Sequence, residues 1–265
     1  MKRCVVGLLC VLAFSMVWIS CKKNDSTKAV VPISDSLPTN EANPYDSFGY
    51  WHNVVLDSIE QQRSTRSVDG FNGSCDVIRK FYRSRNWPSL DDCHFDGIPS
   101  MVMEAAIDRN GFIDRSDWSD SVKLRLHQLF TTLVQVGSDS CSYPKLKTAI
   151  QRFEYEVLKS TLTSLDKEVL LKASSIARYS ANRWIAQPNA TQTFEPAMLA
   201  KVFERNQVEL ATPVNSHLTA RTGFFEKIGK WIAVTAIDIS CAIVDLSVAS
   251  GVGGSDFMKE VFEIH

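Results

Sequence analysis

Residues 164–184 read SLDKEVLLKASSIARYSANRW, and they give the clearest indication of the fold class. Ser164 is a residue type that caps the start of a helix, because its side-chain oxygen accepts a hydrogen bond from a backbone amide that has no partner inside the helix. Apolar side chains then recur at helical spacing: Leu165, Val169, Ala173, Ile176 and Trp184. This period predicts an amphipathic helix that buries one side.

Two further strong helical patterns precede this one. One begins at Ser116 as the expected N-cap and ends at Gly137, and the other spans residues 143–162. Their apolar residues lie three or four positions apart: Val122, Leu126, Leu129 and Leu133 in the first, and Leu146, Ile150, Phe153 and Val157 in the second. Short connections between such helices favour antiparallel packing.

Weaker helical patterns lie earlier in the chain. A stripe of Phe48, Trp51, Val55 and Ile59 predicts a helix that Asp46 or Ser47 caps, and shorter helices are expected at 74–82 and at about 99–109. No stretch alternates apolar and polar residues as a half-buried strand does. The sequence therefore predicts an all-α protein, folded as an irregular multi-helix bundle.

The first twenty residues have the composition of a secretory leader. A short basic head at residues 1–3 is followed by an apolar run to Ile19 that contains no ionisable acid or base. Such a run is typical of a signal peptide, whereas a spanning helix needs ~20 predominantly apolar residues. Ser20 is small, so cleavage after it leaves Cys21 as the first residue of the mature chain.

The sequence ISC at 19–21 resembles the cleavage site of bacterial lipoproteins. In that class the cysteine carries a diacylglycerol thioether and an amide-linked acyl chain such as palmitate, so the resemblance implies that Cys21 is lipidated. Because each buried methylene contributes ~0.8 kcal/mol, two or more acyl chains hold a protein on a bilayer. The expected location is the bacterial cell envelope, with the outer membrane as the bilayer and the leaflet left open.

The predicted organisation is a signal peptide at 1–20, a flexible tether at 21–45 and one helical domain at 46–265. The tether lacks periodicity and is rich in Lys, Asn, Ser, Thr and Pro. Two of the 29 basic residues lie in the leader, so 27 bases face 30 acids in the mature chain. This balance argues against a nucleic-acid partner. The expected partners are the membrane, through the lipid anchor, and a protein or glycan.

The stretch NPYDSFGYWHNVVLDSI at 43–59 carries the candidate binding residues His52 and Asn53. It resembles a motif, NPYD…G…HN…L, that recurs after the tether in Bacteroidota lipoproteins of unknown function. The resemblance implies membership of that group and brings no activity with it. In one interpretation His52 and Asn53 form part of a binding site. In the other, His52 packs in the buried helix face and bonds a neighbouring backbone carbonyl.

Four cysteines remain in the mature domain: Cys75, Cys93, Cys141 and Cys241. An oxidising compartment permits disulfides, and four cysteines allow three pairings. A disulfide between Cys75 and Cys93 is expected, because the two flank one short helical stretch. Free thiols are the alternative.

Two acidic stretches are candidate metal sites. In AIDRNGFIDRSD at 106–117, an EF-hand register places Asp108, Asn110, Asp114 and Asp117 on ligand positions for calcium, although Ala106 occupies the first position. The alternative is a helix that ends at Asn110 and Gly111 in a left-handed cap, with Ser116 starting the next helix. The stretch DDCHFD at 91–96 has the residue types of a divalent-metal site or of a polar loop.

The run WIAVTAIDISCAIVDLSVASGVGG at 231–254 is apolar enough to raise the question of membrane insertion. Asp238 and Asp245 lie seven positions apart on one helical face, and each carboxylate costs ~2.5–3.5 kcal/mol near a bilayer centre. A buried core helix with both carboxylates paired or solvated is therefore the preferred interpretation.

Signatures of covalent catalysis are missing from the chain: G-x-S-x-G, H-E-x-x-H, a phosphate loop and G-x-G-x-x-G. The expected function is an envelope lipoprotein that acts as a binding or interaction module, using the 43–59 helix or the C-terminal helix as its docking face. The alternative is a metal-dependent or hydrolytic enzyme that uses one of the two acidic stretches.

Overall fold

The structure is a computed structural model that describes residues 37–65, 70–90, 95, 97–140, 142–186, 230–245 and 247–263. Helices make up nearly all of this part of the chain, and no strand occurs in it, so the prediction of an all-α multi-helix bundle is confirmed. The helices are α2 Asp46–Ser64, α3 Gly70–Ser84, α5 Ile98–Arg115, α6 Asp120–Ser140, α7 Tyr143–Lys159, α8 Ser164–Ile185, α11 Lys230–Asp245 and α12 Val248–Glu263. The leader and Cys21 lie outside the described residues.

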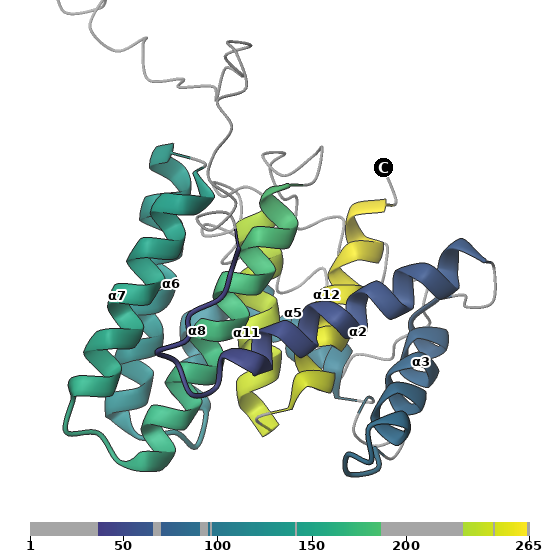
Figure 1. The fold of residues 1–265 in the computed structure, drawn as a ribbon, viewed down its shortest axis with the longest axis horizontal. Helices are drawn as coiled ribbons and strands as arrows, with labels where there is room; N and C mark the ends of the chain where they lie inside the picture. The colour runs from purple at the N-terminus through teal and green to yellow at the C-terminus, as the bar shows by residue number, and fades with distance from the viewer. Residues whose placement is uncertain are drawn as a thin grey trace, which may run out of the picture. The chain divides into compact units, whose positions relative to one another are not determined.

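Helix α8 is the central element of the bundle. It packs against α2, α7, α11 and α6, and Figure 1 shows α2 crossing in front of it. Its N-cap is Thr163 and not Ser164, because the Thr163 hydroxyl accepts a hydrogen bond of 3.1 Å from the Asp166 amide. Leu165, expected on the buried side, is 55% exposed, since the buried part of the helix begins only at Val169.

Helix boundaries differ from the predicted ones around residue 116. Ser116 ends α5, and its hydroxyl donates to the Ile113 carbonyl at 2.7 Å, so the prediction that it caps the next helix is wrong. Ser119 takes that place, since its hydroxyl accepts from the Val122 amide at 3.3 Å. Helix α6 then continues through Gly137 as far as Ser140, and α7 ends at Lys159.

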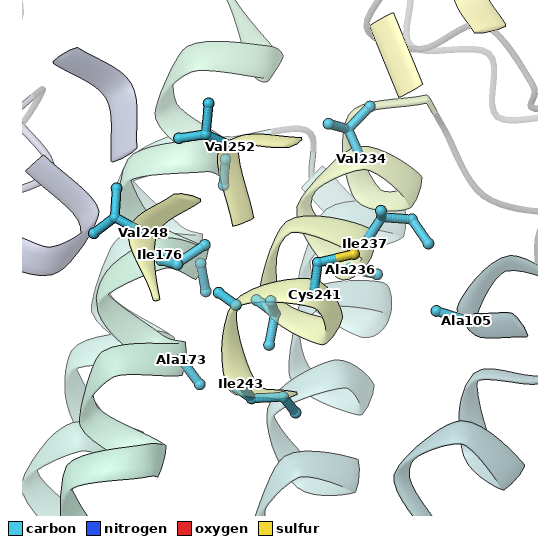
Figure 2. Packing of buried hydrophobic residues seen from close by; sticks show 14 of the residues in the cluster. Ala105, Ala173, Ile176, Val234, Ala236, Ile237, Cys241, Ile243, Val248 and Val252 are labelled. Carbon is cyan, nitrogen blue, oxygen red and sulfur yellow. The ribbon is translucent and has the colours of Figure 1, made fainter. Parts of the chain in front are cut away.

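The apolar C-terminal run forms two helices where one was expected. Helices α11 and α12 pack against each other, and α11 also packs against α8 and α5. Small residues allow this approach: a side-chain carbon added at Gly254 would lie 2.9 Å from the sulfur of Cys241. Figure 2 shows the apolar core that α5, α8, α11 and α12 share around Cys241. None of the described helices is long and apolar enough to cross a membrane.

An aromatic cluster joins α3 to α2. Asn86 adopts the left-handed conformation (φ 54°), and the Trp87 amide returns to the Tyr82 carbonyl at 3.0 Å, which is the pattern of a Schellman helix end. This turn brings the Trp87 ring to 4.9 Å from Tyr82 and 5.6 Å from Trp51, measured between ring centroids. The cluster fixes the position of α3 beside α2.

Candidate functional site: two buried polar clusters

The segment before α2 is part of the folded domain. Asn43 is 3% exposed, and its amide nitrogen donates to the Leu171 carbonyl at 2.9 Å and to Glu154 at 2.6 Å. Asn40 donates to the other oxygen of Glu154 at 2.6 Å. We call residues 38–45 the strap. Helix α2 begins at Asp46, but its N-cap is Tyr45 and it has no side-chain capping bond, so the prediction that Asp46 or Ser47 caps it is wrong. The strap, which the sequence assigned to the flexible tether at 21–45, is bonded to α7 and α8.

The first polar cluster lies under the strap and is called the Arg178 cluster: Asn40, Asn43, Asp46, Glu154, Ser174, Arg178 and Tyr179. Arg178 and Glu154 are both fully buried, and the guanidinium contacts both oxygens of Glu154 at 3.0–3.1 Å. The guanidinium also lies 2.5 Å from Asp46, and it donates to the carbonyl of Pro38. One cation therefore joins the strap, the start of α2, and α7 to α8.

The electrostatics of this cluster favour a charged arginine. Burial alone lowers the pKa of Arg178, but the two carboxylates of Glu154 and Asp46 raise it by more, so its net pKa is raised. Tyr179 donates to the second oxygen of Asp46 at 3.0 Å, and Ser174 donates to Glu154 at 3.0 Å. Buried charges that are paired and hydrogen-bonded in this way stabilise one arrangement of the chain, and removal of a single partner leaves an uncompensated charge.

Gly49 is the point of closest approach between α2 and α8. Its amide donates to the Ser175 hydroxyl at 2.9 Å, and that hydroxyl donates to the Asp46 carbonyl at 2.8 Å. A side-chain carbon added at Gly49 would lie 2.5 Å from the Ser175 carbonyl oxygen and 2.6 Å from a ring carbon of Tyr179. Only glycine fits the observed contact.

The second polar cluster lies further along the same helix face and is called the His52 cluster: His52, Ser180, Trp184, Thr235, Asp238 and Ser255. His52 and Asp238 are both fully buried, and Nε2 of His52 lies 3.6 Å from Oδ2 of Asp238. That oxygen is 2.5 Å from the Ser180 hydroxyl and accepts from the Ser255 hydroxyl at 3.1 Å. Ser180 also contacts Thr235 at 3.1 Å.

Burial shifts both titratable groups of the His52 cluster toward their neutral forms. It raises the pKa of Asp238 to about 8, although Ser180, Ser255 and the Trp184 indole act in the opposite direction. It lowers the pKa of His52 to about 4, although the hydrogen bond to Asn53 opposes this. Both shifts favour the uncharged imidazole beside the protonated carboxyl group.

The candidate binding residues thus face the interior or its edge. His52 sits at 0% exposure, and its Nδ1 is 3.1 Å from the Asn53 side-chain oxygen. Asn53 is half-buried, and its amide donates to the Tyr179 carbonyl at 2.9 Å. The motif residues of α2 and the strap accordingly share one role in the structure: they fasten to α8 and its neighbours. The motif residues in these contacts are Asn43, Asp46, Gly49, His52 and Asn53.

The four candidate calcium ligands do not share one loop, since three of them lie on α5 and Asp117 follows it. Helix α5 continues through Gly111 to Arg115, with one non-helical residue at Asp108, so the alternative prediction of a left-handed helix end at Asn110 and Gly111 is wrong. The Asp108 carboxylate accepts from the Gly111 amide at 3.0 Å and so caps the second part of the helix. Asp114 contacts His127 at 2.9 Å, and Asp117 follows the helix end.

Within the described ranges, no group of three or more His, Cys, Asp or Glu side chains is placed to hold a metal ion. Calcium at Asp108, Asn110, Asp114 and Asp117 stays a prediction that rests on the sequence. Residues 91–94 and Asp96, which make up most of the second acidic stretch, lie outside the described residues.

Cys75 is a thiol at 3% exposure on α3, and burial raises its pKa to about 12. Cys93 lies outside the described residues, so its expected disulfide with Cys75 stays a prediction. A thiol with a raised pKa is a poor nucleophile. Its surroundings are those of a small core residue.

Sequence reasoning found His52 and Asp238 but missed Arg178 and Glu154. The available signal was the composition of residues 173–181, ASSIARYSA, where one arginine lies among small and apolar residues on a buried helix. A charge in that setting requires a buried partner. Its partners are 24 and 132 positions away in the chain, which no local pattern specifies.

Comparison of the chain with protein-family models, with curated proteins and with solved structures finds no match.

Proposed function

We propose that this protein is a lipid-anchored component of a bacterial cell envelope whose helical domain serves as a binding or interaction module. The observation that carries the proposal is Cys21, which directly follows an apolar leader and a small residue. An acylated cysteine at that position holds the domain at a bilayer without a spanning helix.

The geometry of the domain supports binding over chemistry. His52, Ser180 and Asp238 have the residue types of a serine–histidine–aspartate triad, but each is 0% exposed and contacts side chains of neighbouring helices. A reacting group must come within hydrogen-bond reach of a substrate, and these groups contact protein instead. The Arg178 cluster is closed in the same way, since its arginine and glutamate have no exposed surface.

The sequence indicated two helices as docking faces, and neighbouring helices of the bundle pack against both. The motif face of α2 packs against α8, and α11 packs against α8, α5 and α12. A partner therefore binds elsewhere on the domain. The solvent-facing side of α2 is one such surface, since Tyr50 on it is 48% exposed.

The anchor is tested by metabolic labelling with a palmitate analogue during expression in a bacterium that acylates lipoproteins. The wild-type chain is expected to carry the label, and its mature form is expected to begin at Cys21 by mass spectrometry. Cys21→Ser is expected to lose the label, and Cys10→Ser, a matched change inside the leader, is expected to keep it. Label that persists in Cys21→Ser, or a wild-type chain without label, overturns the proposed anchor.

The absence of metal chemistry is tested separately by elemental analysis of the purified full-length protein. The proposal expects less than one equivalent of any divalent metal. A stoichiometric metal that Asp108→Asn or Asp114→Asn removes would replace the binding module with a metal-dependent function.

A further inference from the structure

The His52 cluster lies where four helices meet. α2 contributes His52, α8 contributes Ser180, α11 contributes Asp238, and α12 contributes Ser255. The Asp238 carboxyl group of α11 contacts one side chain from each of the other three helices. The state of that carboxyl group therefore bears on whether the α11–α12 hairpin stays in place.

The contacts of this carboxyl group do not suit an ionised state. Oδ2 of Asp238 accepts from Ser255 and contacts Ser180, whereas Oδ1 is buried with no hydrogen bond of good geometry within the described residues, although the Trp184 indole also acts on this carboxyl group and lowers its pKa. Nε2 of His52 and Nε1 of Trp184 are likewise buried without a hydrogen bond of good geometry there. A buried charge is tolerated when it is paired and hydrogen-bonded, and Asp238 has hydroxyl groups where a charged partner would be needed.

The charged groups around the cluster are engaged elsewhere. Arg183 of α8, whose field lowers the pKa of both Asp238 and His52, contacts Asp57 at 2.5 Å and Glu60 at 2.8 Å on α2. On α12, Asp256 pairs with Arg63 at 3.0 Å. From α5, the apolar Ile98 side chain lies against Gly253 of α12.

We propose that His52 and Asp238 form a proton-operated latch, which holds the α11–α12 hairpin against α2 and α8 while Asp238 is protonated and releases it when that proton passes to solvent. No covalent step is involved. The ionised carboxylate gains hydration when the hairpin separates from α8, so the open form binds the proton less tightly than the closed form. The raised pKa of Asp238 places the transition at mildly alkaline pH.

The size of the effect follows from linkage between protonation and opening. Between the ordinary pKa of an aspartate, 3.8, and the raised value of about 8, the opening equilibrium of Asp238 increases about tenfold per pH unit. His52 has the opposite effect between its lowered pKa of about 4 and its ordinary value of 6.5, because the open form binds a proton on the imidazole more tightly than the closed form does. The net expectation is little change up to about pH 6.5 and a roughly tenfold increase in hairpin opening between about pH 6.5 and 8.5.

Cys241 is a native reporter for this opening. It lies on α11 at 0% exposure, in the apolar core that the hairpin shares with α5 and α8 (Figure 2), so a thiol reagent reaches it only when the hairpin leaves that core. The full-length protein is labelled over a pH series, the modified peptide is quantified by mass spectrometry, and each rate is divided by that of the urea-unfolded chain. The wild-type ratio is expected to rise about tenfold between about pH 6.5 and 8.5.

Asp238→Asn keeps the shape of the carboxyl group and cannot ionise, so its labelling ratio is expected to stay constant with pH. Asp57→Asn is the matched control: it removes an exposed carboxylate that contacts the nearby Arg183, and it is expected to keep the wild-type rise. A wild-type ratio that is constant with pH, or an equal rise in Asp238→Asn, overturns the proposal.

Hydrogen exchange of the wild-type protein supplies a test that needs no variant. Amides of α11 and α12 are expected to lose protection about tenfold relative to amides of α6 and α7 between about pH 6.5 and 8.5, after correction for intrinsic exchange. Equal changes in both pairs of helices overturn the latch.

Discussion

Replacement of Gly49 by alanine tests how closely α2 approaches α8. At most helix positions this change is stabilising by about 1 kcal/mol, because alanine has the higher helix propensity. At Gly49 the added carbon would lie 2.5 Å from the Ser175 carbonyl oxygen and 2.6 Å from Tyr179. The carbonyl belongs to the backbone of α8 and cannot rotate away, so the two helices must separate.

The expected magnitude follows from these distances. Ordinary contacts of a side-chain carbon begin near 3.4 Å, so the helices must move apart by most of an ångström. Overpacking of this kind costs about 1–3 kcal/mol, and the weakened hydrogen bond from Gly49 to Ser175 costs about 1 kcal/mol more. After the gain in propensity, a net loss of about 1–3 kcal/mol in the free energy of unfolding is expected for Gly49→Ala.

Denaturant unfolding of the purified protein, followed by far-ultraviolet circular dichroism, measures this loss. Gly97→Ala is the matched control, since a carbon added there meets nothing within 4 Å, and it is expected to change stability by less than about 0.5 kcal/mol. A Gly49→Ala protein that is more stable than the wild type would refute the close approach.

Four further predictions follow from the same contacts. Arg178→Met leaves the buried Glu154 carboxylate without its cation, so it is expected to lower the free energy of unfolding by about 3–5 kcal/mol in a denaturant titration. Thr163→Ala is expected to lower it by about 1 kcal/mol, and Ser164→Ala by less, because Thr163 makes the capping bond. The raised pKa of Asp238 contributes stability that is lost as pH rises toward about 8, and the lowered pKa of His52 contributes stability that is lost as pH falls toward about 4. Above pH 6.5 His52 is largely neutral in both the folded and the unfolded chain, so Asp238 alone makes the stability depend on pH. The free energy of unfolding is therefore expected to fall by roughly 1–2 kcal/mol between pH 6.5 and 8.5 in the wild type and to stay level in Asp238→Asn. Gly254→Val, against Cys241, is expected to lower the midpoint of thermal unfolding by several degrees, which calorimetry measures.

The helices that sequence periodicity predicted are those with a continuous apolar stripe. Leu146, Ile150, Phe153 and Val157 are all buried on α7, as their spacing indicates. Leu165 carries the same pattern and is exposed, because burial there depends on how far the neighbouring helices extend and not on the helix itself.

Helix ends were harder to predict than helix interiors. Ser116 and Ser119 are both capping residue types in sequence, and only the three-dimensional path of the chain decides which one binds an amide. Asp108 is non-helical, yet the helix resumes beyond it because its own carboxylate caps the next turn.

The buried clusters could be predicted only in part. The helical period placed His52 on the apolar face of its helix, with Val55 and Ile59, and the structure agrees. Its contact with Asp238 joins residues far apart in the chain, and such tertiary pairs leave no local signal. The strap was assigned to the tether because its composition is polar, but those polar groups bind Glu154 and Arg178 inside the domain.

The central claim is that the motif at 43–53 fastens the strap and α2 to α8 through buried charge, and a double-mutant cycle between Asp46 and Arg178 measures this most directly. Unfolding free energies are determined for the wild type, Asp46→Asn, Arg178→Met and the double variant. Because the two side chains lie 2.5 Å apart, a favourable coupling of about 1–3 kcal/mol is expected. A coupling indistinguishable from zero would contradict the account.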